Sequence, residues 1–216
     1  MKYETDPLKI REKSLKAIRE LVSLDHLGQD EQKVALQMMQ ASGDLSILEN
    51  LRFSESVVRK GLEALEEDYE ILCDTETVIC GLKDKYLKDE PICLIAKANV
   101  ISQAKSNKKT RSMTAVDLWK PYLAESIILV GNESTALFRL LEILDEMKDE
   151  EKDKKPSLII ATPAGFIGAE DSKQLLWDKH QELDIPCITL LGTRGSSNLA
   201  SMAMNTLLKM QQDAKN

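Results

Sequence analysis

Three short stretches rich in glycine and hydroxyl side chains could bind an anionic ligand. They follow apolar runs of the chain and cover 131–135, 162–168 and 192–198. The last is the most informative, because glycines and serines precede a helix-like segment while Arg194 supplies a cation. Backbone amides of such a loop can hold a carboxylate or a phosphate. No Walker loop and no G-x-G-x-x-G motif occurs. On spacing alone, an anion site and an ordinary strand-to-helix turn fit equally well.

Short apolar runs that alternate with helix-like segments position these loops. The runs predicted to be strands are 70–74, 92–96, 126–131, 157–162 and 186–192. Each is almost continuously apolar, as expected for strands covered by helices on both faces. Helices are expected between them, notably over 134–148, 171–180 and 197–210. This alternation predicts a three-layer α/β sandwich with a mostly parallel sheet of about five strands, whose carboxyl ends carry the ligand site.

The first eighty residues are predicted to be helical. Asp6 and Pro7 are typical of a helix start, and apolar residues then recur at helical spacing up to Leu21. Further helices are expected over 30–41 and after Ser54. The segment 145–155 is almost entirely charged, which predicts a solvated helix end. Since no convincing domain boundary occurs, the chain 1–216 is expected to form one domain.

Composition excludes several classes of partner. The net charge of −7 argues against nucleic acid and anionic membranes, which need a basic face. Apolar runs such as Ile127–Val130 are far too short to cross a bilayer. The four cysteines have no C-x-x-C spacing, so a zinc cluster is not expected. Free thiols in apolar runs indicate the reducing cytoplasm.

Motifs along nearly the whole chain resemble those of the precorrin-8X methylmutases, in the same order. The segment 163–173 reads P-A-G-F-I-G-A-E-D-S-K, similar to the family's P-V-G-F-V-x-A-x-E-S-K. The segment 132–137 reads N-E-S-T-A-L, similar to N-A-P-T-A-L. The other similar stretches are 6–14, 73–81, 110–113, 192–197 and 203–205.

The resemblance implies an isomerase of cobalamin biosynthesis. Such an enzyme moves a methyl group from ring carbon 11 to ring carbon 12 of precorrin-8X, or of its cobalt form, to give hydrogenobyrinate or cobyrinate. The resemblance also implies a homodimer with the corrinoid near the subunit interface. It implies no metal or organic cofactor for the chemistry.

Residues that match family positions are expected to bind the substrate. They are Ser14, Asp74, Thr110, Arg111, Gly165, Arg194, Gly195, Ser196 and Ser197. By the resemblance, Arg111 contacts corrinoid carboxylates, for which two parallel guanidinium donors are well suited. Three alternatives stay open: Arg111 as a surface arginine on a lysine-rich loop, Ser14 as a small residue of a helix face, and Asp74 as a helix cap.

Two positions of one motif depart from the family pattern. The catalytic motif R-x-x-H-A-x-G-D corresponds to 37–44 here, where Gln37 replaces the arginine and Gln40 the histidine. A histidine can deliver a proton to the ring, whereas an amide can only form hydrogen bonds. The remaining histidines, His26 and His180, match no family position, and we expect both at the surface.

Three functions are therefore compared. The first is the isomerase, with proton delivery altered at Gln40. The second is a catalytically impaired corrinoid-binding protein, which the glutamine favours. The third, an unrelated nucleotide-binding α/β protein, leaves the ordered motifs unexplained. The resemblance over nearly the whole chain favours the isomerase.

Overall fold

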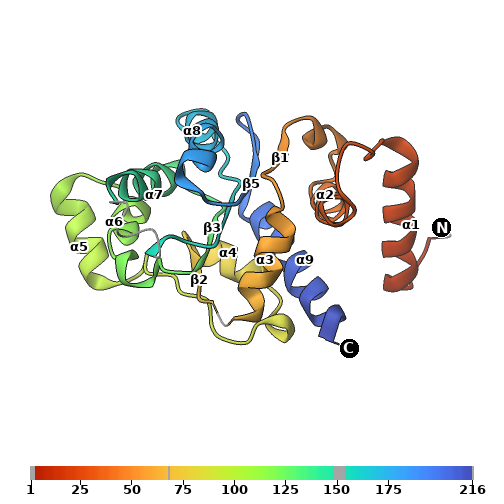
Figure 1. Cartoon of the computed structure of the whole chain (residues 1–216), viewed down its shortest axis with the longest axis horizontal. Helices are drawn as coiled ribbons and strands as arrows, with labels where there is room; N and C mark the ends of the chain where they lie inside the picture. Colours follow the sequence, from red (N-terminus) through yellow and green to blue (C-terminus); the bar gives the residue numbers. More distant parts are fainter. Residues whose placement is uncertain (1–2, 68, 148–153, 216) are drawn as a thin grey trace.

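A five-stranded sheet forms the centre of the computed structural model, which describes residues 3–67, 69–147 and 154–215 (Figure 1). The strand order is β1-β5-β4-β3-β2. The strands are β1 (Leu51–Phe53), β2 (Ile71–Cys73), β3 (Ile127–Val130), β4 (Leu158–Ala161) and β5 (Cys187–Leu190). All neighbours pair in parallel except β1, which is antiparallel to β5. The predicted α/β class with a mostly parallel sheet is confirmed.

One predicted strand is wrong and one strand was missed. Within 92–96 only Ile92 pairs with the sheet, through a single bridge to Leu72. The pairing stops there because the chain turns, with the Lys97 amide donating to the Leu94 carbonyl at 3.2 Å. The missed strand β1 has three residues, too few to show a strand period.

Helices cover both faces of the sheet. The helices are α1 (Pro7–Leu21), α2 (Gln29–Ser42), α3 (Val57–Glu66), α4 (Glu76–Gly81), α5 (Ala98–Asn107), α6 (Arg111–Val116), α7 (Ser134–Glu146), α8 (Ala169–Leu183) and α9 (Ser197–Lys215). Three 3₁₀ turns join them: η1 (Leu45–Glu49), η2 (Asp84–Tyr86) and η3 (Lys120–Tyr122). The predicted helix over 134–148 ends at Glu146, and 148–153 lies outside the described residues.

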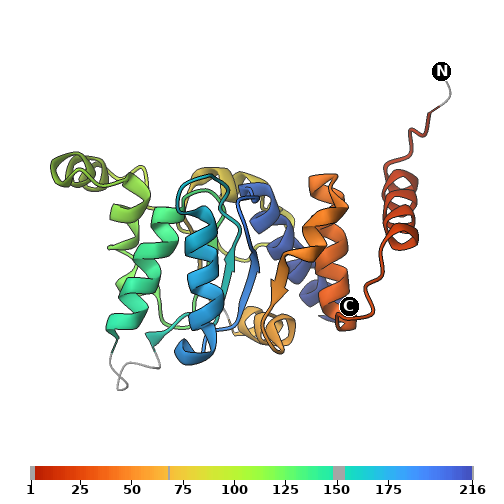
Figure 2. The ribbon, with the colours of Figure 1, turned by 90° about the horizontal axis from the view of Figure 1, so that it is seen from above.

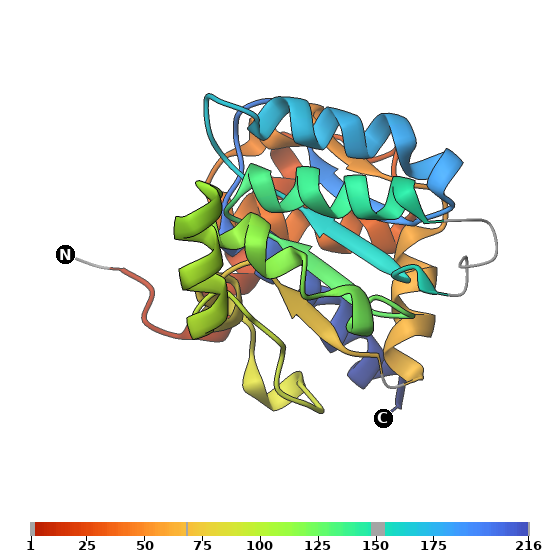
Figure 3. The same cartoon turned by 90° about the vertical axis from the view of Figure 1, so that its left-hand side faces the viewer.

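Alternation along the strands divides the core in two. Ile127 and Leu129 of β3 pack with apolar side chains of α2, α3 and α9. Ile128 and Val130 face the other way, toward α6, α7 and α8. Figure 3 shows α7 and α8 running side by side along this second face. Both faces are therefore buried, which explains the continuous apolar strands.

The first helix lies outside this three-layer body. Its start is as predicted, since the Asp6 carboxylate accepts hydrogen bonds from the amides of Leu8 and Lys9 at 2.9 and 3.3 Å. Ile18 is the buried residue of α1, whereas Leu8 and Leu21 are 72% and 70% exposed. The helix lies next to α2 at the edge of the molecule (Figure 2).

In the part of the chain that the structure describes, every helix is too short or too polar to span a bilayer.

Close packing at the end of β3 generates a first prediction. A Cβ at Gly131 would lie 2.7 Å from the Ser197 Cα and 2.7 Å from the Val78 Cγ2. Gly131→Ala should therefore lower the free energy of unfolding by about 1–3 kcal/mol, the usual range for overpacking. The matched control is Gly28→Ala, where the Cβ meets only the movable end of Glu31. Urea unfolding should show little change for the control, and equal losses would contradict the packing argument.

Candidate functional site

The loops that follow the strands at the carboxyl edge of the sheet are called their exits. The exits of β4 and β5 are in contact with each other. The Thr162 hydroxyl donates to the Ser196 carbonyl at 2.9 Å, and the Gly165 amide donates to the Thr193 carbonyl at 3.0 Å. A Cβ on Gly195 would lie 2.2 Å from the Thr162 carbonyl oxygen, so only glycine fits there. The two glycine-rich loops therefore form one continuous surface.

A buried lysine supports this surface from the interior of the protein. Lys173 of α8 is fully buried, and its Nζ donates to the Arg194 carbonyl at 2.6 Å. Burial lowers the Lys173 pKa to about 8, while the charge of Glu170 opposes the shift. Lys173 was not predicted as a site residue, although it is the last residue of the motif over 163–173.

The Arg194 side chain is engaged within the protein. Its Nη1 donates to the Asp44 carboxylate and to the Ser46 hydroxyl at 2.6 Å, and Nη2 donates to the Ser46 carbonyl at 3.1 Å. Hydrogen bonds from Ser46, followed by the Arg194 charge, lower the pKa of Asp44. Arg194 therefore ties the β5 exit to the segment after α2, rather than presenting a free cation.

This connection brings Gln40 beside the β5 exit. Gln40 lies near the end of α2 and is half-buried. The Asn198 amide, next to Ser197, donates to the carbonyl of the adjacent Ala41 at 3.5 Å. Among the described residues, the side-chain amide of Gln40 makes no hydrogen bond. It is thus available to a ligand at this edge.

The two predicted serines of the β5 exit begin the long helix α9. The Ser196 hydroxyl accepts from the Leu199 amide at 3.2 Å, as a helix cap does. Ser197 is buried, and its carbonyl accepts from the Ser201 hydroxyl at 2.9 Å. These hydrogen bonds hold the first turn of α9 in place at the edge of the sheet where Gln40 lies.

Asp74 fixes the neighbouring strand exit. Its carboxylate is buried and accepts from the backbone amides of Gly131, Asn132 and Glu133 at 3.1, 2.9 and 2.9 Å. Burial raises the Asp74 pKa, and the three amide donors oppose this rise. The carboxylate therefore holds the β3 exit, and its oxygens are already used.

The other predicted residues lie at opposite ends of the molecule. Thr110 and exposed Arg111 begin α6, with the Thr110 hydroxyl 2.7 Å from the Thr135 hydroxyl. Ser14 lies on α1, where its hydroxyl donates to the Ile10 carbonyl at 2.8 Å. Figures 1 and 2 show α1 and α6 on opposite sides of the sheet. One chain alone does not bring Ser14 and Arg111 to a common ligand.

Neither histidine replaces the missing imidazole. His26 is exposed, as expected. His180 is half-buried on α8, where it stacks on Trp177 with ring centroids 4.6 Å apart. Within the described residues, no group of three or more potential metal ligands occurs. Cys73 and Cys187 are buried free thiols, in agreement with the sequence interpretation.

The fold and these loops define an α/β protein with a candidate ligand surface at the carboxyl edge of its sheet. Residues 9–210 match the family model of precorrin-8X methylmutase. A precorrin-8X methylmutase of Pseudomonas aeruginosa is 34% identical over 95% of this chain and 96% of the relative. A cobalt-precorrin-8 methylmutase of Leptospira interrogans is 28% identical over 92% of this chain and 91% of the relative. The chain belongs to the precorrin-8X methylmutase family.

Solved structures agree with this assignment. The structure of the precorrin-8X methylmutase of Thermus thermophilus superposes on this one with a TM-score of 0.83. The two chains are 28% identical, and the match covers 96% of this chain and 97% of that chain. A precorrin-8X methylmutase related protein has a TM-score of 0.78, with 26% identity over 91% of this chain and 99% of that chain. The arrangement of strand exits described above is thus part of a family architecture.

The buried lysine generates a second prediction. Between about pH 8 and 10.5, an unfolded chain keeps the Lys173 proton that the folded protein has lost. The stability of the native protein relative to Lys173→Met should therefore rise with pH across this window, and be constant below it. Urea unfolding over a pH series measures this difference. The exposed lysine variant Lys105→Met should show no such trend, and a pH-independent difference for Lys173→Met would contradict the assignment.

Proposed function

We propose that this protein is an isomerase of cobalamin biosynthesis. It moves a methyl group from ring carbon 11 to ring carbon 12 of precorrin-8X or its cobalt form, giving hydrogenobyrinate or cobyrinate. The observation that carries the proposal is the family match over residues 9–210, which includes all three strand exits of the carboxyl edge. The four free cysteines support a reducing compartment, and we place the protein in the cytoplasm.

The carboxyl edge offers a surface suited to a large, partly apolar ring. Phe166 and Ile167, on the loop between β4 and α8, are 97% and 92% exposed. Apolar side chains this exposed favour contact with a ligand or partner over contact with water. Gly165 and Gly195 lie beside them in the paired loops, so the ring can approach the backbone closely.

Gln40 has the position of the catalytic histidine in the proposed reaction. Its amide is unoccupied among the described residues and can donate a hydrogen bond to the ring. It cannot transfer a proton at useful cost, because an amide nitrogen is not acidic at neutral pH. The chain can therefore hold and orient the substrate at Gln40, but the proton must come from another group or from water. We expect slow turnover.

A homodimer would complete the set of predicted ligand contacts. Helix α1, which carries Ser14, and helix α6, which begins at Arg111, lie on opposite sides of the sheet in one chain, yet a second copy could place its α6 beside the first copy's α1 (Figure 1). Leu8 and Leu21 of α1 are mostly exposed, and Ile10 is 44% exposed. Their burial against a second copy would remove apolar area from water, which is the main driving force of association.

The third prediction concerns this assembly. Sedimentation at micromolar concentration should show a dimer, and Leu8→Glu should shift the protein toward monomer because a charge replaces apolar contact. Lys16→Glu, at an exposed and polar position of the same helix, serves as the control and should remain dimeric. A wild-type monomer, with ligand present, would contradict the proposal.

The fourth prediction tests the proposed reaction at its altered position. Gln40→His should raise the rate of the methyl shift by roughly 10²–10⁴-fold, the usual contribution of general acid catalysis. Product affinity should change little, because both side chains are polar and similar in size. The rate follows from the absorbance change as ring conjugation is altered.

The control for this experiment is Gln40→Leu, which keeps the side-chain size but offers no proton. Its activity should not exceed that of the wild type. If the wild type and the histidine variant both bind product but neither converts substrate, the protein is a corrinoid-binding protein rather than an isomerase. If the wild type already turns over at a rate that the histidine variant does not improve, the proton comes from another group and the role given to position 40 is wrong. If no form binds product, the proposed function itself is wrong.

A further inference from the structure

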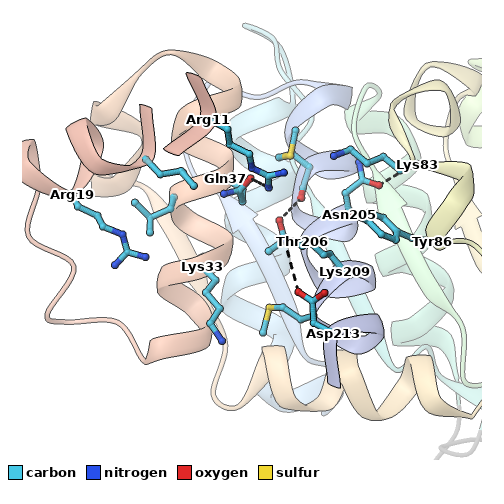
Figure 4. Close-up of a pocket in the computed structure, with 14 residues that line it drawn as sticks. Arg11, Arg19, Lys33, Gln37, Lys83, Tyr86, Asn205, Thr206, Lys209 and Asp213 are labelled. Atoms are coloured by element: carbon cyan, nitrogen blue, oxygen red, sulfur yellow. Dashed lines mark hydrogen bonds and ion pairs between the residues drawn. The ribbon is translucent and has the colours of Figure 1, made fainter. Parts of the chain in front are cut away.

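A basic groove lies on the α1 side of the molecule, between α1, α2, η2 and α9 (Figure 4). Its volume is about 240 Å³. Its charged residues are Arg11, Arg19, Lys33, Lys83, Lys209 and Asp213. Five cations against one carboxylate is unusual in a chain whose net charge is −7. This basic groove therefore carries positive charge, whereas the chain as a whole is negatively charged.

Three of the five cations have no carboxylate partner in the described part of the chain. Arg11 donates to the neutral Gln37 Oε1 at 2.7 Å. Arg19 and Lys83 form no ion pair with any described residue. A guanidinium or ammonium group without an acidic neighbour keeps its full attraction for an added anion. The groove therefore has unused positive charge.

The remaining two cations are compensated only in part. Lys33 contacts Asp30 at 2.7 Å, but both side chains are about half exposed to water. Lys209 lies 3.9 Å from Asp213, at the limit of an ion pair. Such exposed pairs are weak, so both lysines can also turn toward a ligand.

The groove begins close to Gln40. Gln37, which lines it, precedes Gln40 by less than one helical turn of α2. Met202, which also lines it, follows Asn198 by about one turn of α9, and Asn198 contacts Ala41. A molecule bound at Gln40 can thus extend a substituent into the groove.

The size and lining of the groove restrict what it can hold. Its volume of about 240 Å³ is below the 300–1,000 Å³ typical of pockets for drug-sized ligands, so it takes part of a molecule and not a macrocycle. Leu15, Leu36 and Tyr86 add apolar surface between the cations. This combination fits short aliphatic chains that end in carboxylates.

We propose that the basic groove binds carboxylate side chains at the periphery of the ring substrate while the ring lies at Gln40. The inference rests on the proposed function, because it takes the ring's position from it. Arg11 is the central residue. Its Nη2 is fixed by Gln37, and its other guanidinium donors can pair with a carboxylate. Lys83 provides a second charge across the groove (Figure 4).

Binding of hydrogenobyrinate, compared with its fully esterified methyl ester, tests the proposal as a fifth prediction. The variants are Arg11→Gln, Lys83→Gln and the double variant. Each single substitution should weaken binding of the acid by roughly tenfold, in line with the loss of a hydrogen bond to a charged group. The ester should bind all forms equally, because it has no charge to lose. Trp fluorescence or ring absorbance gives the affinities.

The matched control is Lys16→Gln, which removes one positive charge from α1 outside the groove. Its affinity for the acid should stay within about twofold of the wild type, since exposed charges are screened by salt. Thermal unfolding of each variant checks that the fold is retained.

The outcomes separate the two proposals. If the wild type binds neither acid nor ester, the proposed function fails. If the wild type binds the acid but the groove variants bind it equally well, the groove inference fails and the proposed function stands. Equal wild-type affinity for acid and ester would also overturn the groove inference.

Discussion

The contact between the β4 and β5 exits is the constraint on which the rest of the site depends. Gly195 passes so close to the Thr162 carbonyl that no side chain fits between them. Lys173 then holds the Arg194 carbonyl from the buried side, where a charge without a carboxylate partner is costly. The hydrogen bond to the Arg194 carbonyl offsets part of this cost and restrains the loop. A ligand surface made of backbone needs such support.

Through Arg194 the same loop also ties down the segment after α2, the helix near whose end Gln40 lies. The backbone of Arg194 belongs to the β5 exit, whereas its guanidinium binds Asp44 and Ser46, just after α2. A single residue therefore links the sheet to the helix that carries the altered position. Among the described residues, the hydrogen bonds that tie this end of α2 to the β5 exit and to α9 involve Ala41, Asp44 and Ser46 and not the Gln40 side chain, so a histidine in place of the glutamine breaks none of them.

Much of the fold could be predicted because its signals are local. Short stretches of neighbouring residues suffice to predict the continuous apolar strands, the glycine-rich exits and the start of α1 at Asp6. Contacts between distant segments could not be predicted in this way. The orientation of Arg194 toward Asp44 and the use of Asp74 by the backbone of 131–133 depend on how the sheet assembles. Strand β1 was too short to show a pattern.

The peripheral position of α1 makes one wall of the basic groove softer than the others. This helix buries mainly Ile18, whereas α9 opposite is buried along most of its length. Segments with few buried contacts open at a small fraction of the free energy of global unfolding. Of the two walls, the one formed by α1 is therefore the one that can move at the lower cost in free energy. A ligand that bridges the two walls must hold α1 in place. The free-energy cost of restraining this one helix is therefore subtracted from the binding free energy.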